Sequence, residues 1–286
     1  MPAPENPASI HLTPELDAIS ERLVSARLDA EALPTFPGSL PRELESAYAI
    51  QQASISRWPD EVAGWKVGMV APEYRHNLAA ERLAGPVFAQ TVFRIEPGER
   101  ITMPIYSGGF AAVEAEFIFV LADTIEPVAR DYSDDDLMQL IAELRVGAEI
   151  ASSPMAEVNN LGPCSIVSDF GNNAGLIVGP SVQDWSTLSP DDLPAEVTVD
   201  GERVGSATAR AIKGGLLQAL RFLIEVSAIR GISLAKGTYI SCGAVTGIHD
   251  VTADSKATVD FGPYGAFDVD FAPILPRQAR AVSAKA

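Results

Sequence analysis

The sequence predicts an α+β protein, because helical and strand-like patterns occupy different parts of the chain. Within residues 14–57 apolar residues recur at helical spacing, whereas beyond residue 60 most segments indicate strands, with a few helices inserted. This order lacks the regular strand–helix alternation of a doubly wound sheet. No Gly-x-Gly-x-x-Gly or P-loop pattern follows a strand, so a nucleotide cofactor is not expected.

Two helices are expected at the N-terminal end. The first extends from Pro14 to about Leu33, with Thr13 as N-cap and proline at the first helical position. The second runs from about Arg42 to Arg57. We therefore predict a helical region over residues 1–60, a β-rich domain that carries the candidate site over 61–275, and a flexible tail over 276–286.

The segment from Gly64 to Met69 is predicted to be a strand with one lysine, Lys66, among apolar and glycine residues. That lysine is either exposed by strand alternation or a partly buried ammonium directed at a substrate oxygen, and the residues leave both interpretations open. A short helix is expected from Leu78 to Gly85, and a series of strands from Pro86 onward.

Two glutamates interrupt the apolar strand from Ala112 to Leu121. Glu114 and Glu116 lie two residues apart, so a strand places both side chains on one face. Burying two like charges unpaired is expensive, and a divalent cation between them would remove that penalty. The alternative is a solvent-facing pair on an edge strand. The small and apolar neighbours favour the metal site.

A third carboxylate, Glu149, has a similar setting in the strand-like segment from Val146 to Ile150. Three carboxylates without thiolate or imidazole favour a hard cation: Mg²⁺, Mn²⁺ or Ca²⁺. Such a site leaves part of the metal's coordination shell open to a 2-oxo acid, whose enolate the metal would stabilise as a Lewis acid. Lys66 would add a second positive charge on the same oxygens.

The remaining segments offer fewer candidates. The polar loop from Asp169 to Gly175 contains Asp169, which is either a turn residue or, with Asn172, a source of hydrogen bonds to a substrate. A hairpin is expected around Asp200–Gly201, a helix over residues 214–229, and further strands over residues 237–271.

Composition excludes several classes of function. The net charge of −17 argues against nucleic acid or an anionic membrane as partner, but not against a small anionic substrate. Two cysteines are too few for a disulfide framework, and His11, His76 and His249 are too scattered for a histidine-rich zinc site or a Ser-His-Asp triad. With neither a signal-peptide pattern nor an apolar run of membrane length, a cytoplasmic protein is expected.

Five segments together resemble the successive motifs of the 2-keto-4-pentenoate hydratase group, within the fumarylacetoacetate hydrolase superfamily. The resemblance runs from about Leu16 to Phe271, nearly the whole chain. The motifs are Gly64-Trp65-Lys66-Val67-Gly68, Val113-Glu114-Ala115-Glu116-Phe117, Gly147-Ala148-Glu149, Asp169-Phe170-Gly171-Asn172-Asn173, and an amphipathic helix followed by residues 230–237 and 241–244.

This resemblance implies a mixed β-roll core of the fumarylacetoacetate hydrolase C-terminal-domain type, preceded by the helical region. It implies a Mg²⁺ or Mn²⁺ site on Glu114, Glu116 and Glu149. It also implies that Lys66 contacts the oxo-acid end of a substrate, and that the pocket is lined by Asp169 and Asn172. A homo-oligomer built from dimers is implied as well.

The implied activity is hydration of a 2-hydroxy-2,4-dienoate, such as 2-hydroxypenta-2,4-dienoate, to a 4-hydroxy-2-oxo acid. The alternatives are decarboxylation of 4-oxalocrotonate-type acids, hydrolysis of a C–C bond in a β-diketone, and a non-catalytic partner subunit. A hydrolase needs a general base for water, and His76 and His249 lie outside the matched motifs, which favours the first two reactions. Retention of the three glutamates with Lys66 argues against a non-catalytic subunit.

The sequence departs from the family pattern at two positions. Phe170 stands where the family has asparagine after the aspartate, and Gly215 stands where it has histidine in a Gly-His-Pro motif. Both positions bear on the identity of the substrate.

Overall fold

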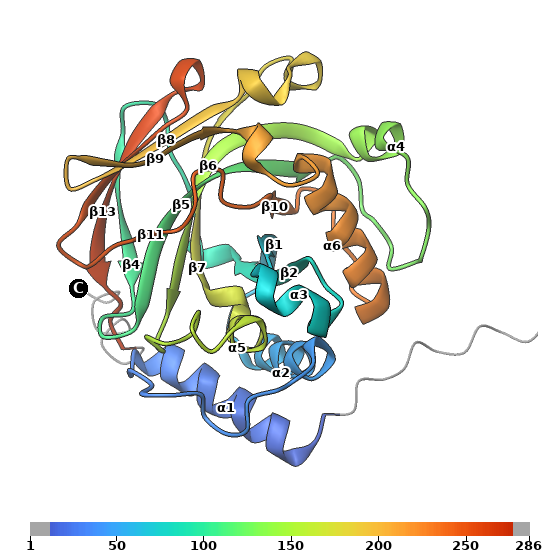
Figure 1. The fold of residues 1–286 in the computed structure, drawn as a ribbon, viewed down its shortest axis with the longest axis vertical. Helices are drawn as coiled ribbons and strands as arrows, with labels where there is room; N and C mark the ends of the chain where they lie inside the picture. The colour runs from blue at the N-terminus through green and yellow to red at the C-terminus, as the bar shows by residue number, and fades with distance from the viewer. Residues whose placement is uncertain (1–11, 277–286) are drawn as a thin grey trace, which may run out of the picture.

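The predicted α+β class is confirmed by the computed structural model, which describes residues 12–276 (Figure 1). The predicted tail over 276–286 therefore lies almost entirely outside the described residues. The helices are α1 Pro14–Asp29, α2 Leu44–Arg57, α3 Pro72–Leu78, α4 Asp134–Gln139, α5 Pro163–Ser168 and α6 Leu216–Arg230. The strands are β1 Val62–Met69, β2 Arg82–Phe88, β3 Val92–Arg94, β4 Arg100–Ile105, β5 Phe110–Leu121, β6 Ile141–Ser153, β7 Asn173–Ser181, β8 Pro194–Val199, β9 Glu202–Thr208, β10 Tyr239–Ser241, β11 His249–Asp250, β12 Lys256–Asp260 and β13 Ala266–Pro273.

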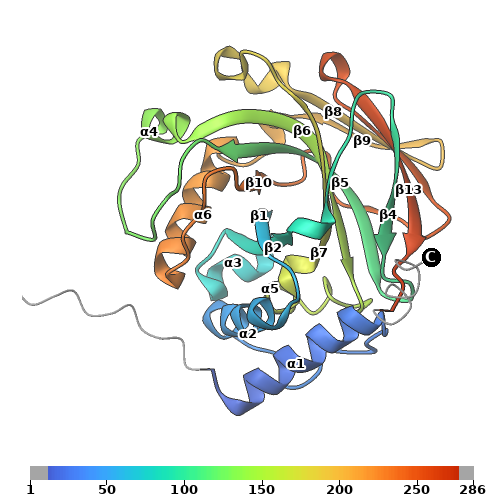
Figure 2. The same ribbon diagram turned by 180° about the vertical axis from the view of Figure 1, so that it is seen from behind.

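Two mixed sheets form the body of the molecule. The larger has the order β2-β1-β10-β5-β6-β7-β3, with β11 also paired to β5, and the smaller has the order β4-β13-β12-β8-β9. Most neighbours are antiparallel, while β1 with β10, β3 with β7 and β4 with β13 are parallel. Figures 1 and 2 show β5 and β6 as long, curved strands, with α1, α2 and α5 together at one end of the molecule. The expected mixed β-roll with helices is what the chain forms.

Strand β5 lies at the centre of the larger sheet and is buried on both faces. Its odd-numbered residues, such as Val113 and Phe117, pack into the main hydrophobic core, which also contains residues of the smaller sheet such as Val259 of β12. Its even-numbered residues, including Glu114 and Glu116, therefore project from the opposite face. The period-2 pattern in the sequence reflects this alternation.

The N-terminal helices are close to the predicted ones. The Thr13 hydroxyl accepts a hydrogen bond from the Leu16 amide at 3.3 Å and caps α1. This helix ends at Asp29, four residues before the predicted end, because Ala30 adopts a left-handed conformation with φ 51°.

The helix predicted from Leu78 to Gly85 is wrong. Helix α3 ends at Leu78, and Arg82–Phe88 forms strand β2, which pairs antiparallel with β1. The segment is too short for periodicity to separate helix from strand, and pairing in the sheet decides its conformation. Gly85 permits a close packing, because a Cβ there would lie 2.3 Å from the Phe170 carbonyl oxygen.

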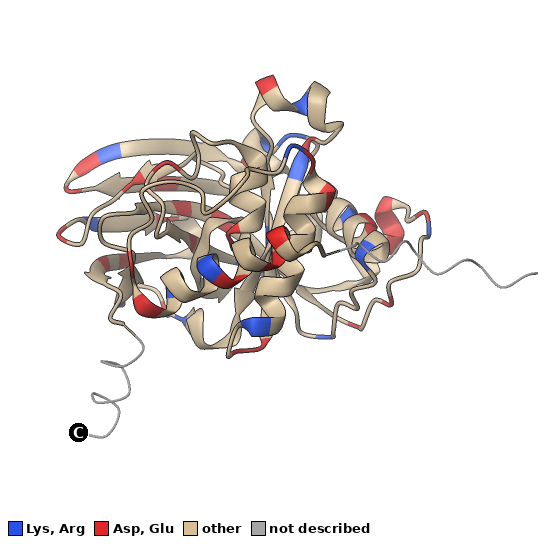
Figure 3. Ribbon diagram, turned by 90° about the horizontal axis from the view of Figure 1, so that it is seen from below, with Lys and Arg blue, Asp and Glu red and all other residues tan. Residues whose placement is uncertain are grey.

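The predicted hairpin is confirmed, since Asp200 and Gly201 have positive φ angles between β8 and β9. Acidic residues are spread over many helices, strands and loops (Figure 3). Within residues 12–276, no helix is long and apolar enough to cross a membrane.

Candidate metal centre

Three buried carboxylates meet where β5 pairs with β6. Glu114 lies directly opposite Glu149, and Glu116 lies opposite Gly147. One carboxylate oxygen from each of the three glutamates lies within 4.8 Å of the others. Glu114, Glu116 and Glu149 are 5%, 1% and 0% exposed, respectively. The alternative of a solvent-facing pair on an edge strand is therefore wrong, and the three candidate ligands converge.

Hydrogen bonds from neighbouring strands fix the orientation of two of these carboxylates. Glu116 Oε2 accepts hydrogen bonds from the Ser241 hydroxyl and, at 2.8 Å, from the Gly243 amide. Glu149 Oε1 accepts one at 3.0 Å from Asn173 Nδ2. Partners of this kind orient metal ligands and tune their basicity.

Lys66 faces the same cluster from β1, because Lys66 pairs with Ser241 on β10, which in turn pairs with β5. Its Nζ lies 3.6 Å from Glu149 Oε2 and donates a 3.3 Å hydrogen bond to Asn172 Oδ1. The side chain is 7% exposed. Of the two interpretations that the sequence left open, the buried ammonium is the one that the structure supports.

The electrostatics of the cluster are unbalanced. Burial, together with repulsion from Glu149, raises the pKa of Glu114 to about 8, although Lys66 opposes the shift. Burial and repulsion from Glu149 and Glu114 raise the pKa of Glu116 well above its usual value. Burial alone would lower the pKa of Lys66, but the attraction of the three glutamates raises it. One ammonium does not neutralise three carboxylates.

The donor set fits a divalent cation. Each of the three glutamates offers only oxygen, the donor preferred by hard cations. Glu149 Oε2 is fully buried and accepts no hydrogen bond from any residue in the described part of the chain. An orphaned buried carboxylate oxygen is unfavourable, and a cation between the three glutamates would satisfy it.

A cavity of about 360 Å³ adjoins the cluster and suits a small molecule. Its walls include Glu114, Lys66, Asn172 and Asn159. Asn172 Nδ2 also donates to Asn159 Oδ1 at 3.2 Å, so the two amides form one polar wall beside the ammonium. Asn172, a predicted substrate-binding residue, thus lies beside the candidate ligands.

Asp169 is not among the residues that line this cavity. It is 1% exposed and pairs with Arg27 of α1, whose Nε lies 2.5 Å from Asp169 Oδ1 and whose Nη2 lies 2.9 Å from Oδ2. Arg27 also donates to the carbonyl oxygens of Ser152 and Asn173. The structure therefore brings together five of the six predicted site residues and directs the sixth to an ion pair.

The architecture matches that of solved enzymes. The structure of 4-oxalocrotonate decarboxylase from Pseudomonas putida G7 with magnesium and adipate aligns with a TM-score of 0.75 at 20% identity, covering 91% of this chain and 99% of that one. The chain shares the fold of this decarboxylase. No family model and no curated protein matches the sequence.

More distant structures share this fold. Fumarylpyruvate hydrolase from Pseudomonas aeruginosa, with Mn²⁺ and pyruvate, aligns with a TM-score of 0.55 at 12% identity over 76% of this chain and 91% of that one. 5-Carboxymethyl-2-hydroxymuconate delta-isomerase from Mycobacterium smegmatis aligns with a TM-score of 0.51 at 13% identity over 75% and 81%. At these identities the comparisons establish the fold alone.

Both departures from the family pattern lie away from the cavity beside Lys66. Phe170 adopts a left-handed conformation with φ 56° and packs in an aromatic cluster, with its ring 5.4 Å from Trp58 and 5.0 Å from Phe88. Gly215 is the N-cap of α6 and borders a different cleft, between α4 and α6. Neither residue lines the cavity that adjoins the glutamates.

Three residues that sequence reasoning did not select belong to this site. Asn173 and Ser241 orient two of the glutamates, and Arg82 lines the cavity. Asn173 follows Asn172 in the same polar loop, and Ser241 lies in a matched motif, so both offered a signal. Arg82 offered none, because its segment was predicted to be helical.

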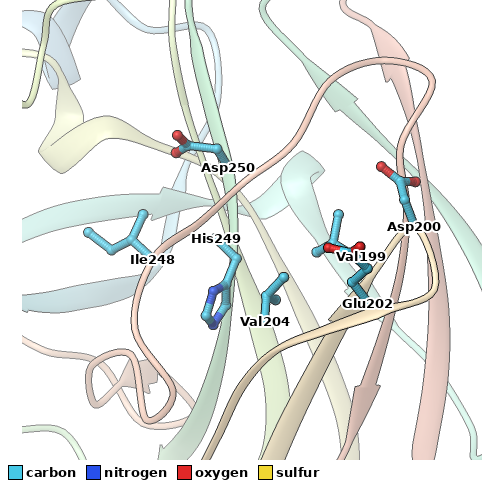
Figure 4. Close-up of a pocket in the computed structure, with 7 residues that line it drawn as sticks. All are labelled: Val199, Asp200, Glu202, Val204, Ile248, His249 and Asp250. Atoms are coloured by element: carbon cyan, nitrogen blue, oxygen red, sulfur yellow. The ribbon is translucent and has the colours of Figure 1, made fainter.

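The described histidines do not join the cluster. His249 lies in a surface hollow beside the β8–β9 hairpin (Figure 4). Its Nε2 is 3.0 Å from the Thr246 hydroxyl. Its companions in Figure 4 include Asp200 and Glu202, but none of the three clustered glutamates. His76 is exposed on α3. His11 lies outside the described residues.

Proposed function

We propose that this protein is an enzyme that holds Mg²⁺ or Mn²⁺ on Glu114, Glu116 and Glu149 and acts on a small 2-oxo acid. The observation that carries the proposal is the set of three buried carboxylates within 4.8 Å of one another, with the Lys66 ammonium beside them. The solved decarboxylase with magnesium and the hydrolase with Mn²⁺, which share this fold, support the choice of metal.

The residues around the cavity suit chemistry at an oxo-acid group. When bound, the cation would supply a Lewis acid for the substrate's carboxylate and 2-oxo oxygens. Lys66 holds a positive charge at the same place, and Asn172 orients its ammonium. A buried ammonium stabilises negative charge that develops on the 2-oxo oxygen more strongly than an exposed one, because the surroundings screen it less.

The reaction that we propose first is hydration of a 2-hydroxy-2,4-dienoate. The enol proton leaves the oxygen on C2 and a proton is added at C5, which gives a 2-oxo-3-enoate. The water oxygen then bonds to C4 and its proton is added at C3, which gives the 4-hydroxy-2-oxo acid. Both steps place negative charge on the C2 oxygen, where Lys66 is proposed to lie. We also propose that the protein forms a homo-oligomer built from dimers.

Decarboxylation of a 4-oxalocrotonate-type acid is the second candidate. It is favoured by the similarity in fold to 4-oxalocrotonate decarboxylase, which extends over 99% of that chain. Hydrolysis of a C–C bond has less support, because neither described histidine joins the glutamates as a general base. A non-catalytic subunit would have no need of a buried lysine beside three buried carboxylates.

The test is turnover with defined substrates. Purified protein with Mg²⁺ would be incubated with 2-hydroxypenta-2,4-dienoate and with 4-oxalocrotonate, and the ultraviolet absorbance and CO₂ release followed. We expect metal-dependent loss of absorbance that disappears with EDTA and in Glu116→Gln, but persists in the exposed control Glu202→Gln. CO₂ release would select the decarboxylase. No turnover of either compound with metal present would contradict both reactions.

A further inference from the structure

Asn159 and Asn172 are the two amide side chains on the wall of the cavity beside the glutamates. Asn172 is 3% exposed, whereas Asn159 is partly exposed, on the segment between β6 and α5. Their hydrogen bonds form a chain that begins at Lys66. Lys66 Nζ donates to Asn172 Oδ1 at 3.3 Å, and Asn172 Nδ2 donates to Asn159 Oδ1 at 3.2 Å.

The positive charge of Lys66 gives this chain its direction. An ammonium group only donates hydrogen bonds, so Lys66 requires the oxygen of the Asn172 amide. The nitrogen of that amide then faces Asn159, which must meet this donor with its own oxygen. Asn159 Nδ2 is left without a hydrogen-bond partner among the residues that the structure describes. Asn159 therefore offers a donor to a ligand in the cavity that it lines.

The backbone around Asn159 is held in place on both sides. Val158 is fully buried, and its carbonyl oxygen accepts a hydrogen bond at 3.0 Å from the Ser165 hydroxyl. The Asn159 carbonyl oxygen accepts one at 3.1 Å from the Gly162 amide. A binding group that is fixed before the ligand arrives loses little freedom on binding. Asn159 thus differs from its exposed neighbour Asn160.

The donor on Asn159 is uncharged, and this limits the group that it selects. The cations on the same cavity wall are Lys66, Arg75, Arg82 and Lys213. Hydrogen bonds between charged partners are the stronger ones, so an anionic group of a ligand would be drawn to these cations. A neutral oxygen, such as that of a hydroxyl group or of water, suits the Asn159 amide.

We propose that Asn159 determines specificity by donating a hydrogen bond to a neutral oxygen at C4 of the 2-oxo acid. This oxygen belongs to water before the addition and to the 4-hydroxyl group after it. The oxo-acid end lies at Lys66 and the glutamates, and Asn172 separates Lys66 from Asn159 by the width of one amide. Asn159 neither gains nor loses a proton, and the proton from water is still added at C3. The inference rests on the proposed function and names a residue that recognises its substrate.

A donor at this place favours hydration over decarboxylation. Water held by Asn159 is already close to C4, which removes part of the entropic barrier to its addition. Decarboxylation of a 4-oxalocrotonate-type acid forms no bond between oxygen and C4, so the Asn159 donor would have no partner in that reaction.

The test uses two 2-oxo acids that differ only in an oxygen on C4. They are 4-hydroxy-3,3-dimethyl-2-oxobutanoate and 3,3-dimethyl-2-oxobutanoate, and because C3 is blocked in both, neither can lose water during the measurement. Calorimetric titration of the Mn²⁺-loaded protein gives a Kd for each. We expect the native protein to bind the 4-hydroxy acid about 10-fold more tightly, the effect of about one hydrogen bond.

Asn159→Leu removes the donor, keeps the approximate size of the side chain, and should abolish this preference. The Kd for the acid without the hydroxyl group should remain nearly native. If Asn159→Leu does not bind Mn²⁺, Asn159→Ala takes its place with the same expected result. Asn160→Ala is the matched control, because it removes an exposed amide from the next position, and it should keep the preference.

The other outcomes are decisive as well. Equal Kd values in the native protein, a preference retained without the Asn159 donor, or one lost in Asn160→Ala would overturn the inference. Equal weakening of both ligands, with the preference kept, would show that Asn159 only supports Asn172, and would overturn it too. Binding of 2-oxobutanoate tests the proposed function separately. If this binding does not depend on Mn²⁺, that function is contradicted. If it does and neither blocked acid binds, only the inference is overturned.

Discussion

Asn173 Nδ2 lies 3.0 Å from Glu149 Oε1 and donates a hydrogen bond to it, while the other oxygen, Oε2, lies 3.6 Å from Lys66 Nζ. The amide thus occupies one side of the carboxylate and leaves the other directed at the cluster. Because Asn173 begins β7 and Glu149 lies within β6, the pairing of these two strands brings the amide to the ligand.

Asn173→Ala should weaken Mn²⁺ binding about 10- to 100-fold, the usual effect of losing a partner that orients a metal ligand. Calorimetric titration with Mn²⁺ measures it directly. Asn160→Ala is the control, because Asn160 is exposed and its Nδ2 donates to Glu157 at the surface. Native affinity in Asn173→Ala would show that this hydrogen bond does not orient a metal ligand.

Glu116→Gln should abolish Mn²⁺ binding and leave the fold intact. The substitution preserves shape and replaces a carboxyl group whose ionised form is disfavoured by burial and by Glu149 and Glu114, so the metal-free variant should be at least as stable as the native protein. Mn²⁺ titration and urea unfolding measure the two effects, with the exposed Glu202→Gln as control. Unchanged Mn²⁺ affinity in Glu116→Gln would disprove the site.

Lys66→Met should reduce turnover about 100-fold or more, the size of effect seen when one stabilising charge is removed from an active site. With Mn²⁺ bound, the unfolding free energy should change little, because the metal offsets the glutamates' charge. The kcat and the urea midpoint, each measured with Mn²⁺, separate the two roles. Lys256→Met, an exposed substitution on β12, is the control. Native kcat in Lys66→Met would mean that the ammonium does not act on substrate.

Stability of the metal-free protein should fall as pH rises. The pKa of Glu114 is about 8 in the folded chain, against an ordinary value of 4.5, mainly because of burial. Between these values the folded state binds more protons than the unfolded state, so this stabilisation is present below pH 4.5 and is lost as pH rises through about 8. Urea unfolding in EDTA from pH 5 to pH 9 measures the slope.

Two comparisons isolate this effect. Glu114→Gln lacks the titrating group, so its stability in EDTA should depend less on pH than that of the native protein. Saturating Mn²⁺ should stabilise the native protein more at high pH, because the metal binds ionised carboxylates and its binding displaces protons. A native slope identical to that of Glu114→Gln would contradict the raised pKa.

Much of the centre was accessible from sequence because strand alternation is a local property. Glu114 and Glu116 share a face whatever surrounds the strand, and small neighbours marked them and Glu149 as buried. The orientation of Lys66 was not accessible, because its burial depends on β2 and β10 on either side of β1. Arg82 was missed for a related reason, since pairing with β1 and not local periodicity makes its segment a strand.

Asp169 shows the opposite limit, in which the sequence indicated a polar loop correctly but not the partner of its carboxylate. Its ion pair with Arg27 joins residues 142 positions apart in the chain. Nothing in the sequence around Arg27, on the predicted first helix, indicated that it would reach the loop between β6 and β7. Long-range ion pairs of this kind depend on the finished fold.

Asp169→Asn should therefore destabilise the protein more than it affects the substrate. Removing one partner of a buried ion pair leaves the other charge uncompensated, and we expect a loss of about 3–5 kcal/mol in unfolding free energy. Asp17→Asn is the matched control. Asp17 pairs with Arg57 over the same 2.5 Å, but the side chains of Arg57 and Asp17 are 33% and 42% exposed. That loss should be at most about 1 kcal/mol. Urea unfolding and the KM of the Mn²⁺-loaded enzyme distinguish the two roles. A large rise in KM with native stability would show that Asp169 contacts the substrate and does not mainly stabilise the fold.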